Sequence, residues 1–192
     1  MALITPRNIA TSKLTDGSAF IQTLPAGTVL QVQQNVMDGY AHYSGGTYYH
    51  LTDMTTNITP RSASSKILIR FQVNISAIDR YHITKMFRAI NNGTDVQIGH
   101  GNVGSNTTRQ KAFATLGTGA RLSGHSTYEQ LTVSAEFLDS PNTTQVVTYK
   151  PYIGVYANHA FTVNAVHYNS GSQNDQWNSA PFSALTVMEI AG

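Results

Sequence analysis

Seven histidines and ten acidic residues are the side chains of this 192-residue chain that could bind a metal or transfer protons. The chain contains no H-E-x-x-H and no His-x-His, the short spacings that metal sites use. His42 and His50 could lie near one another, and His159 and His167 are eight residues apart, which places both on one face of a strand. We predict histidines that hold no metal, although spacing within one chain does not test for a metal shared between subunits on a symmetry axis.

The other patterns of catalysis are missing from the sequence. The acidic residues are too dispersed to single out the pair that hydrolysis of a glycosidic bond needs, and no G-x-S-x-G occurs. The absence of cysteine excludes thiol nucleophiles, disulfides and thiolate metal sites. The glycine motifs at 101–104 and 117–119 lack the strand-to-helix context of a nucleotide site. We therefore predict that the protein is not an enzyme and needs no cofactor.

Tyrosine and histidine cluster between and after the turn sequences at 38–39 and 44–46, in the densest aromatic patch of the chain. Tyrosine is common in binding loops, because it offers a large amphipathic contact area at low entropic cost. A later polar loop, 169–178, carries the only tryptophan. The candidate ligand-binding residues are Tyr40, His42, Tyr43, Tyr48, Tyr49 and Trp177. The alternative for the tyrosines is that they lie in strands and pack on the rim of a core.

Composition restricts the partners of the protein. Charged residues make up 11% of the chain, against about 25% in an average globular protein. The net charge of +2 comes from scattered residues, so there is no basic surface for nucleic acid. We see neither a signal peptide nor an apolar run of 18 residues, and we expect synthesis in a cytoplasm without membrane insertion.

The elements that must position these residues are strands. Residues 67–76 alternate strictly, with Ile67, Ile69, Phe71, Val73 and Ile75 on one face, as in a half-buried antiparallel strand. Further short strands are expected near 28–36, from after His50 to about 57, and near 81–91, 94–98, 127–138, 145–156, 160–168 and 183–190, with no convincing helix. This pattern predicts an all-β protein with an antiparallel β-sandwich or jelly roll over residues 27–192. Residues 1–26 form an extended arm, which is either disordered or clasps a neighbouring subunit or particle.

Three local features sharpen the prediction. Residues 81–91 fit both a helix and a strand, and Asn92-Gly93, typical of a type I′ hairpin turn, favours the strand. Pro151 predicts an edge strand or a bulge. The final strand has apolar residues on both faces, so that one face could pack in the core and the other against a subunit. The interface candidates are Leu185, Val187, Met188 and Ile190.

Four sequence blocks resemble a family of small tail-fibre and virion structural proteins of phages, notably marine and cyanobacterial phages. The blocks are residues 27–33 (GTVLQVQ), 58–69 (ITPRSASSKILI), 137–150 (FLDSPNTTQVVTYK) and 185–192 (LTVMEIAG). Residues 87–94 (FRAINNGT) also resemble the hairpin of this family. The resemblance covers roughly residues 27 to 192.

The resemblance implies a β-sandwich that forms homotrimers on the outside of a virion, on a tail fibre, tail tip or capsid spike, without catalytic residues. We expect non-covalent recognition of a glycan on the host surface, and attachment to other virion proteins through residues 1–26. The alternative is a purely structural capsid decoration protein anchored by the same arm. The chain lacks the coiled-coil or β-helical shaft of long tail fibres, which leaves its place on the head or the tail open.

Overall fold

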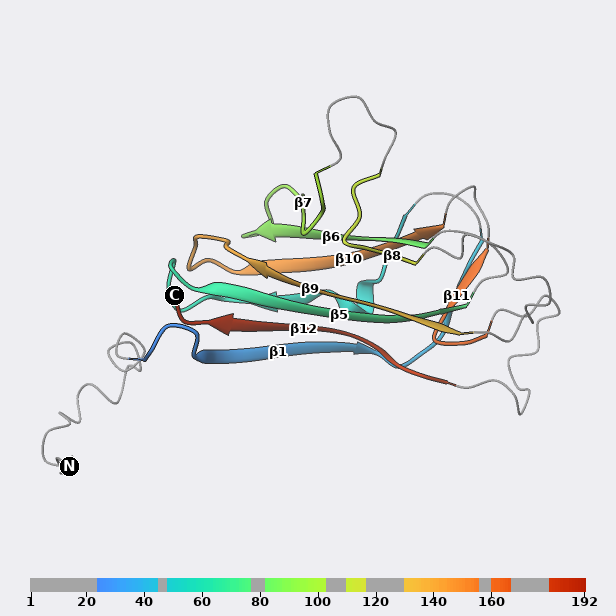
Figure 1. The fold of residues 1–192 in the computed structure, drawn as a ribbon, viewed down its shortest axis with the longest axis horizontal. Helices are drawn as coiled ribbons and strands as arrows, with labels where there is room; N and C mark the ends of the chain where they lie inside the picture. The colour runs from blue at the N-terminus through green and yellow to red at the C-terminus, as the bar shows by residue number, and fades with distance from the viewer. Residues whose placement is uncertain are drawn as a thin grey trace, which may run out of the picture.

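The computed structural model describes residues 24–44, 48–76, 82–102, 110–116, 130–155, 160–166 and 180–192. These residues form two antiparallel β-sheets that pack face to face, and the described part contains no α-helix (Figure 1). The prediction of an all-β antiparallel sandwich is therefore confirmed. The predicted arm, residues 1–26, lies almost entirely outside the described residues.

The first sheet, sheet A, is organised around the long strand that the alternation predicted. This strand, β5, pairs with β9 along one side, and along the other side it pairs first with β12 and then with β11. β1 completes the sheet beside β12, and β2 completes it beside β11. The strands of sheet A are β1 (Val29–Met37), β2 (Ala41–Tyr43), β5 (Lys66–Ser76), β9 (Leu131–Asp139), β11 (Phe161–Val163) and β12 (Ser183–Ile190).

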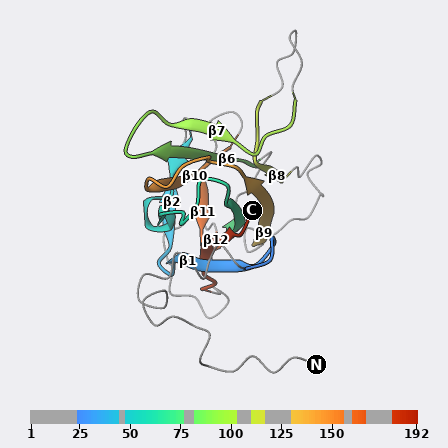
Figure 2. The ribbon, with the colours of Figure 1, turned by 90° about the vertical axis from the view of Figure 1, so that its left-hand side faces the viewer.

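The second sheet, sheet B, has two long central strands, β10 and β6, flanked by short ones. β3 and β4 pair with successive parts of β10, and β7 and β8 pair with successive parts of β6. Viewed along the strands in Figure 2, β6 and β7 lie on the opposite side of the molecule from β1 and β12. The strands of sheet B are β3 (Tyr49–His50), β4 (Thr56–Ile58), β6 (His82–Ile90), β7 (Val96–Ile98), β8 (Ala114–Leu116) and β10 (Val147–Val155). A 3₁₀ turn, η3 (Thr52–Met54), lies between β3 and β4.

The core lies between the two sheets and follows from the period of two. On β5 the inward residues Ile67 to Ile75 are at most 2% exposed, while Arg70 and Gln72 on the other face are exposed. Met86 on β6 and Ile153 on β10 face them from sheet B, both fully buried. Each sheet thus gives one face to the core, and its other face points away from the core.

Pro151 does not mark an edge or a bulge, and that prediction was wrong. β10 is a central strand, with β6 on one side and β3 and β4 on the other. On the β3 and β4 side, pairing is interrupted between His50 and Thr56 by Leu51 and η3, and Pro151 lies opposite this break. Its carbonyl accepts a bond of 2.9 Å from the Leu51 N–H, and the N–H that proline lacks has no strand to bond there.

The hairpin after β6 forms as predicted, but one residue earlier. Asn91 and Asn92 have positive φ values of 49° and 57°, the signature of a type I′ turn at these two positions. The Gly93 N–H closes the turn on the Ile90 carbonyl at 2.9 Å. The strand assignment for β6 is therefore confirmed, and the turn is centred on Asn91-Asn92 instead of Asn92-Gly93.

A buried carboxylate joins the two sheets. Asp139, at the end of β9 in sheet A, is 5% exposed and faces sheet B. It accepts a 2.7 Å bond from Arg88 Nη1 on β6 and a 2.8 Å bond from the fully buried Tyr149 hydroxyl on β10. Burial and the adjacent Asp139 carboxylate raise the pKa of Tyr149 well above its usual value, so the phenol stays protonated and donates.

His82 is another buried ionisable group, and unlike Asp139 it has no hydrogen-bond partner among the described residues. The ring is 3% exposed, lies edge-on to Phe161 at 6.2 Å, and neither nitrogen has a hydrogen-bond partner in the described part of the chain. Burial lowers its pKa from 6.5 to about 4, because a charged imidazolium is poorly solvated there. The folded protein therefore holds this histidine neutral.

Replacing Tyr149 by Phe should lower the free energy of unfolding by about 1–3 kcal/mol, because Asp139 then loses one of its two donors while it stays buried. Urea unfolding monitored by circular dichroism measures the change. Tyr40→Phe is the matched control, since its side chain is 59% exposed and its hydroxyl is accessible to water. Equal losses in the two variants would contradict the role of the network.

Stability should fall as the pH is lowered from about 6.5 to about 4, because the unfolded chain then takes up a proton on His82 that the folded chain does not. The contribution of this residue is about 3 kcal/mol over that interval, at about 1.4 kcal/mol for each pH unit between the two pKa values. Comparison of the wild-type protein with His82→Leu isolates it, since all other groups are shared. Parallel stability curves for the two proteins between pH 7 and pH 4 would contradict the assignment.

Candidate functional site

The structure separates the predicted tyrosines. Tyr43 on β2 and Tyr49 on β3 pack against each other, with ring centroids 4.6 Å apart, and both contact the buried Phe161, at 5.0 and 5.9 Å. Burial raises the pKa of Tyr43. In the single chain these two rings thus lie on the rim of the core, which is the alternative stated for them above. Tyr40 is 59% exposed elsewhere on the surface.

The remaining predicted residues have different environments. The His42 side chain is exposed on β2, with Nδ1 3.1 Å from the Thr162 hydroxyl. Trp177, and with it His159 and His167, lies outside the described residues. Tyr48, directly before β3, belongs to a different set of side chains, on the outer face of sheet B. Among the described residues no three histidine or acidic side chains are grouped closely enough to hold a metal ion.

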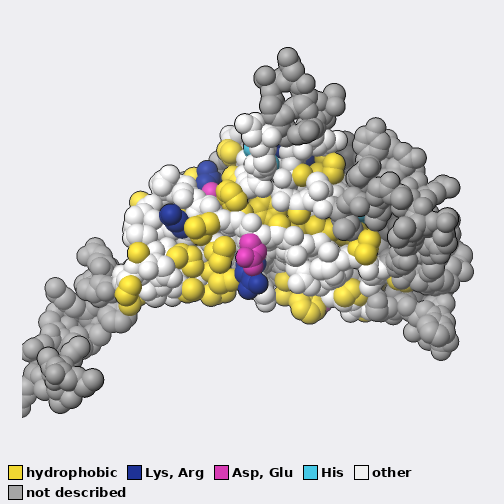
Figure 3. Space-filling view, in the orientation of Figure 1, with side chains coloured by type: hydrophobic (Ala, Val, Ile, Leu, Met, Phe, Trp, Pro, Cys, Tyr) yellow, Lys and Arg dark blue, Asp and Glu magenta, His cyan; other side chains and the backbone are white. Residues whose placement is uncertain are grey.

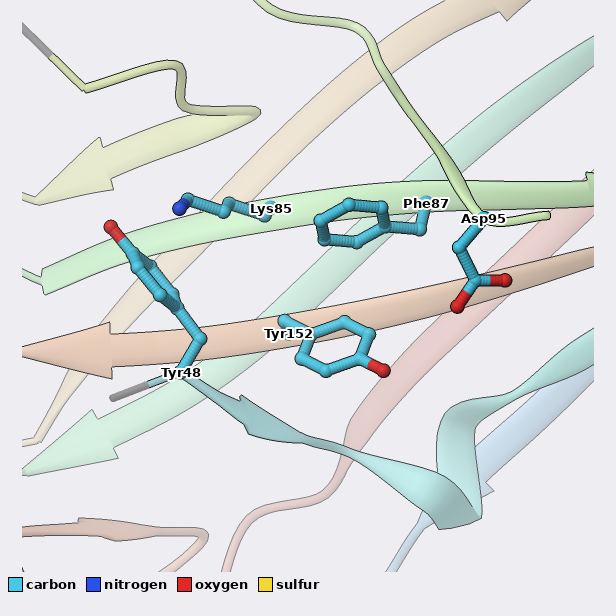
Figure 4. Close-up of a pocket in the computed structure, with 5 residues that line it drawn as sticks. All are labelled: Tyr48, Lys85, Phe87, Asp95 and Tyr152. Atoms are coloured by element: carbon cyan, nitrogen blue, oxygen red, sulfur yellow. The ribbon is translucent and has the colours of Figure 1, made fainter. Parts of the chain in front are cut away.

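An open groove of about 260 Å³ lies on this outer face. It is lined by Tyr48, by Lys85 and Phe87 from β6, by Asp95 before β7, and by Tyr152 from β10. Figure 4 shows the two aromatic rings of Phe87 and Tyr152 in the middle, with Lys85 and Tyr48 at one end and Asp95 at the other. The groove therefore combines an aromatic floor with one cation and one anion at opposite ends.

The cationic end is built from two side chains that position each other. The Lys85 ammonium lies 3.5 Å from the centre of the Tyr48 ring, a cation–π contact, and the Tyr48 hydroxyl donates to Gln110 Oε1. Partial burial lowers the pKa of Lys85 and raises that of Tyr48. Gly154 on β10 makes room for the ring, since a Cβ there would lie 2.9 Å from Tyr48 Cδ1.

The aromatic floor is held from both sides. Tyr152 pairs across the sheet with His50 on β3 and with Lys85 on β6. The imidazole of His50 stacks on the Tyr152 ring, 4.7 Å away and within 13° of parallel, and Phe87 meets the same ring edge-on at 5.1 Å. The Tyr152 ring therefore has a fixed orientation before any ligand arrives.

The anionic end and the floor are tied together by an ion pair. Lys150 on β10 donates to Asp95 Oδ1 at 2.7 Å, and both side chains are partly exposed. Burial and the nearby Lys150 lower the pKa of His50, so the stacked imidazole is neutral at pH 7. The charged groups of the groove already have partners within the chain. The groove is therefore suited to bind a ring with polar substituents. It offers no pair of free carboxylates for hydrolysis.

The interface candidates on β12 divide between the two faces of the strand. Leu185 and Val187 are fully buried in the core of the chain, so neither is available to a second subunit, and their assignment to an interface was wrong. Their side chains alternate with those of Met188 and Ile190, which are partly exposed on the outer face of sheet A. An interface role for Met188 and Ile190 stays a prediction.

Four of the five groove residues were not found from the sequence: Lys85, Phe87, Asp95 and Tyr152. The alternation of the strand at 145–156 already placed Tyr152 opposite the core residues, but the register that sets it beside Lys85 is a long-range property. Sequence alternation could therefore have identified the side chains that face outward, but not which of them lie together in the groove.

No protein-family model and no curated protein sequence matches this chain. Among solved structures, it is similar to a chain in the structure of infectious bursal disease virus Gt strain, with a TM-score of 0.41 and 9% identity over 86% of this chain. A structure of the Gx strain gives a TM-score of 0.35 and 10% identity over 85% of this chain. This chain corresponds to about two fifths of each of those chains, 42% and 40%. Likeness at this level carries no argument about function. Within the described ranges, no helix has the length and hydropathy to cross a bilayer.

Replacing Gly154 by Ala should displace the Tyr48 ring and break its contact with Lys85, because the added methyl group overlaps the ring. In the wild-type protein the ring current of Tyr48 should shift the side-chain proton resonances of Lys85 upfield, and the variant should return them toward ordinary lysine values. Gly39→Ala is the matched control, since nothing lies within 4 Å of a Cβ there. An unchanged Lys85 spectrum in Gly154→Ala would contradict this geometry.

Proposed function

We propose that this protein recognises a host-surface glycan without catalysis, and that it does so as a virion structural protein of the phage tail-fibre type. The observation that carries the recognition part is the groove on sheet B, with its fixed Phe87 and Tyr152 rings between Lys85 and Asp95. The virion part is supported by the four sequence blocks that resemble phage tail-fibre and virion proteins.

A sugar ring suits each part of the groove. Aromatic faces and edges contact the CH groups of a pyranose, and a lysine and a carboxylate bond its hydroxyl groups at either end. The volume of about 260 Å³ lies just below the usual range of small-molecule sites, about 300–1,000 Å³. A shallow, open site of this size fits one sugar unit of a longer surface glycan.

Low charge and abundant hydroxyl and amide side chains are compatible with assembly on a particle. Charged residues are only 11% of the chain, which permits contact between copies over polar, partly hydrated surfaces. In this proposal the protein forms a homotrimer, residues 1–26 attach it to the virion, and the groove faces outward. Sugar binding in each copy is weak, and several copies acting together raise the apparent affinity.

Phe87→Ala and Tyr152→Ala should each weaken glycan binding by about 10-fold to 100-fold, because each removes half of the aromatic floor. A glycan array with the assembled protein, followed by adsorption to host cells, measures the loss. Near-ultraviolet circular dichroism checks that the variants fold.

Tyr40→Ala is the matched control for these variants, since it removes an exposed ring away from the groove. If Trp177→Ala alone abolishes binding while Phe87→Ala and Tyr152→Ala do not, the groove is the wrong site. If none of these substitutions changes adsorption, the purely structural role as a decoration protein replaces glycan recognition.

A further inference from the structure

The groove on the outer face of sheet B carries a positive charge that no described residue neutralises. At one end Asp95 is paired with Lys150, whose ammonium lies 2.7 Å from Oδ1. At the other end Lys85 makes no ion pair with any residue that the structure describes. Its contact at 3.5 Å is with the Tyr48 ring, and burial raises the pKa of Tyr48, so this phenol stays uncharged. The Lys85 ammonium therefore has an aromatic neighbour but no counter-ion in the described part of the chain.

Partial burial distinguishes Lys85 from other cations that make no ion pair. Within the described ranges these are Arg61, Lys66 and Lys111, and all three are exposed, so water solvates their charges. Lys85 is partly buried beside aromatic rings, and the loss of water lowers its pKa. An anion bound next to the ammonium would replace the missing hydration and raise this pKa again. An anionic ligand thus stabilises Lys85 more than it stabilises an exposed lysine.

The described outer face of sheet A differs in this respect. Arg70 and Glu136 are each other's counter-ion there, with Nε 2.6 Å from Oε1, and both side chains are more than half exposed. Beside them lies an apolar row of residues paired across four strands: Val32, Met188, Leu68 and Leu138. Figure 3 shows an acidic and a basic group together on this face, with hydrophobic side chains gathered on both sides. Met188 stays a predicted interface residue, whereas an anionic ligand finds a partly buried cation on sheet B.

We propose that the groove binds an acidic sugar, with the sugar carboxylate against Lys85 and the sugar ring on Phe87 and Tyr152. This inference rests on the glycan recognition proposed above and names the class of sugar: Lys85 meets a carboxylate where a neutral sugar offers a hydroxyl group. A single negative charge matches the site, because Lys85 and the Lys150–Asp95 pair together carry one positive charge. A uronic acid, a sugar ring with one carboxylate, has that charge.

The strand register brings the carboxylate within reach of Lys85. Lys85 lies directly opposite Tyr152 in the pairing of β6 with β10, and residues paired in this way point to the same face, about 5 Å apart at Cβ. A sugar ring that rests on Tyr152 therefore has one edge next to the Lys85 ammonium. The reverse orientation is disfavoured, because it brings the sugar carboxylate to the end of the groove that holds the Asp95 carboxylate (Figure 4). Charge thus determines both the class of sugar and its direction in the groove.

An array of matched sugars tests the preference with the assembled protein. Each pair contains a uronic acid and its neutral parent at the same density: glucuronic acid with glucose, galacturonic acid with galactose, and mannuronic acid with mannose. In the pair that binds, the acid should bind about 10-fold more strongly, since it adds a charge-assisted hydrogen bond. Raising the salt concentration from about 50 mM to about 500 mM should reduce this preference, because salt screens the two charges.

Lys85→Gln removes the charge but keeps a polar side chain, and it should lower the ratio of acid binding to neutral binding to about 1. The ratio isolates the charge, because a groove that is merely distorted loses both sugars together. Lys66→Gln is the matched control: it removes the same charge from an exposed position on β5 of sheet A, and the ratio should stay at about 10. Near-ultraviolet circular dichroism checks that both variants fold.

Three results would overturn the inference. Equal or stronger binding of the neutral sugars, or an acid preference that survives Lys85→Gln, would remove the acidic sugar and leave glycan recognition in place. Binding to neither member of any pair would remove it as well. Adsorption of the Phe87→Ala variant to host cells then decides whether glycan recognition by the groove itself stands.

Discussion

A shared core constrains everything else in this molecule. Because side chains alternate along a strand, sheets A and B can each give only one face to the space between them. Ile67 of sheet A and Met86 of sheet B both lie in this core, and every second residue of their strands must point the other way. The outer face of each sheet is therefore set by the same sequence that forms the core. In this chain the two outer faces differ: sheet B presents aromatic rings with separated charges, and sheet A presents an apolar row beside one ion pair.

The sequence blocks that resemble phage virion proteins contain buried polar groups at the edges of the core. The carboxylate of Glu189 is fully buried, and it accepts bonds of 2.7 Å from the Arg61 N–H and 2.6 Å from Gln31 Nε2. These three residues come from three of the four blocks that resemble phage virion proteins. The fourth block supplies both Asp139 and Tyr149 to the network between the sheets. The blocks are thus places where distant strands satisfy one another's buried polar groups, which assigns them to the scaffold and not to recognition.

Those parts of the fold that depend on local alternation of apolar and polar residues were predictable from the sequence. The inward side of β5 could be named residue by residue, because five branched or aromatic side chains at alternate positions admit no other face. Pro151 was misplaced for a long-range reason, since its position in a central strand depends on the break between β3 and β4. The shift of the turn to Asn91-Asn92 has a local cause, because asparagine also tolerates positive φ.

The candidate site was less accessible from sequence than the fold. Tyr43, Tyr48 and Tyr49 are close neighbours in the chain, yet Tyr48 faces the groove while Tyr43 and Tyr49 pack on Phe161. Composition indicated the right kind of residue, but the grouping of Tyr48 with Phe87 and Tyr152 depends on strand pairing. That pairing is determined by the whole sheet.

The assignment of sugar binding to sheet B and of contact between copies to sheet A is tested most directly by hydroxyl-radical footprinting. The assembled protein is compared with and without saccharide. Methionine and aromatic side chains react readily with the radical, so Met188 reports on sheet A, and Phe87 and Tyr152 report on sheet B. We predict that Met188 becomes protected as the copies assemble, while Phe87 and Tyr152 become protected only when saccharide is added. Protection of Phe87 and Tyr152 by assembly alone, with Met188 still fully reactive, would contradict this assignment.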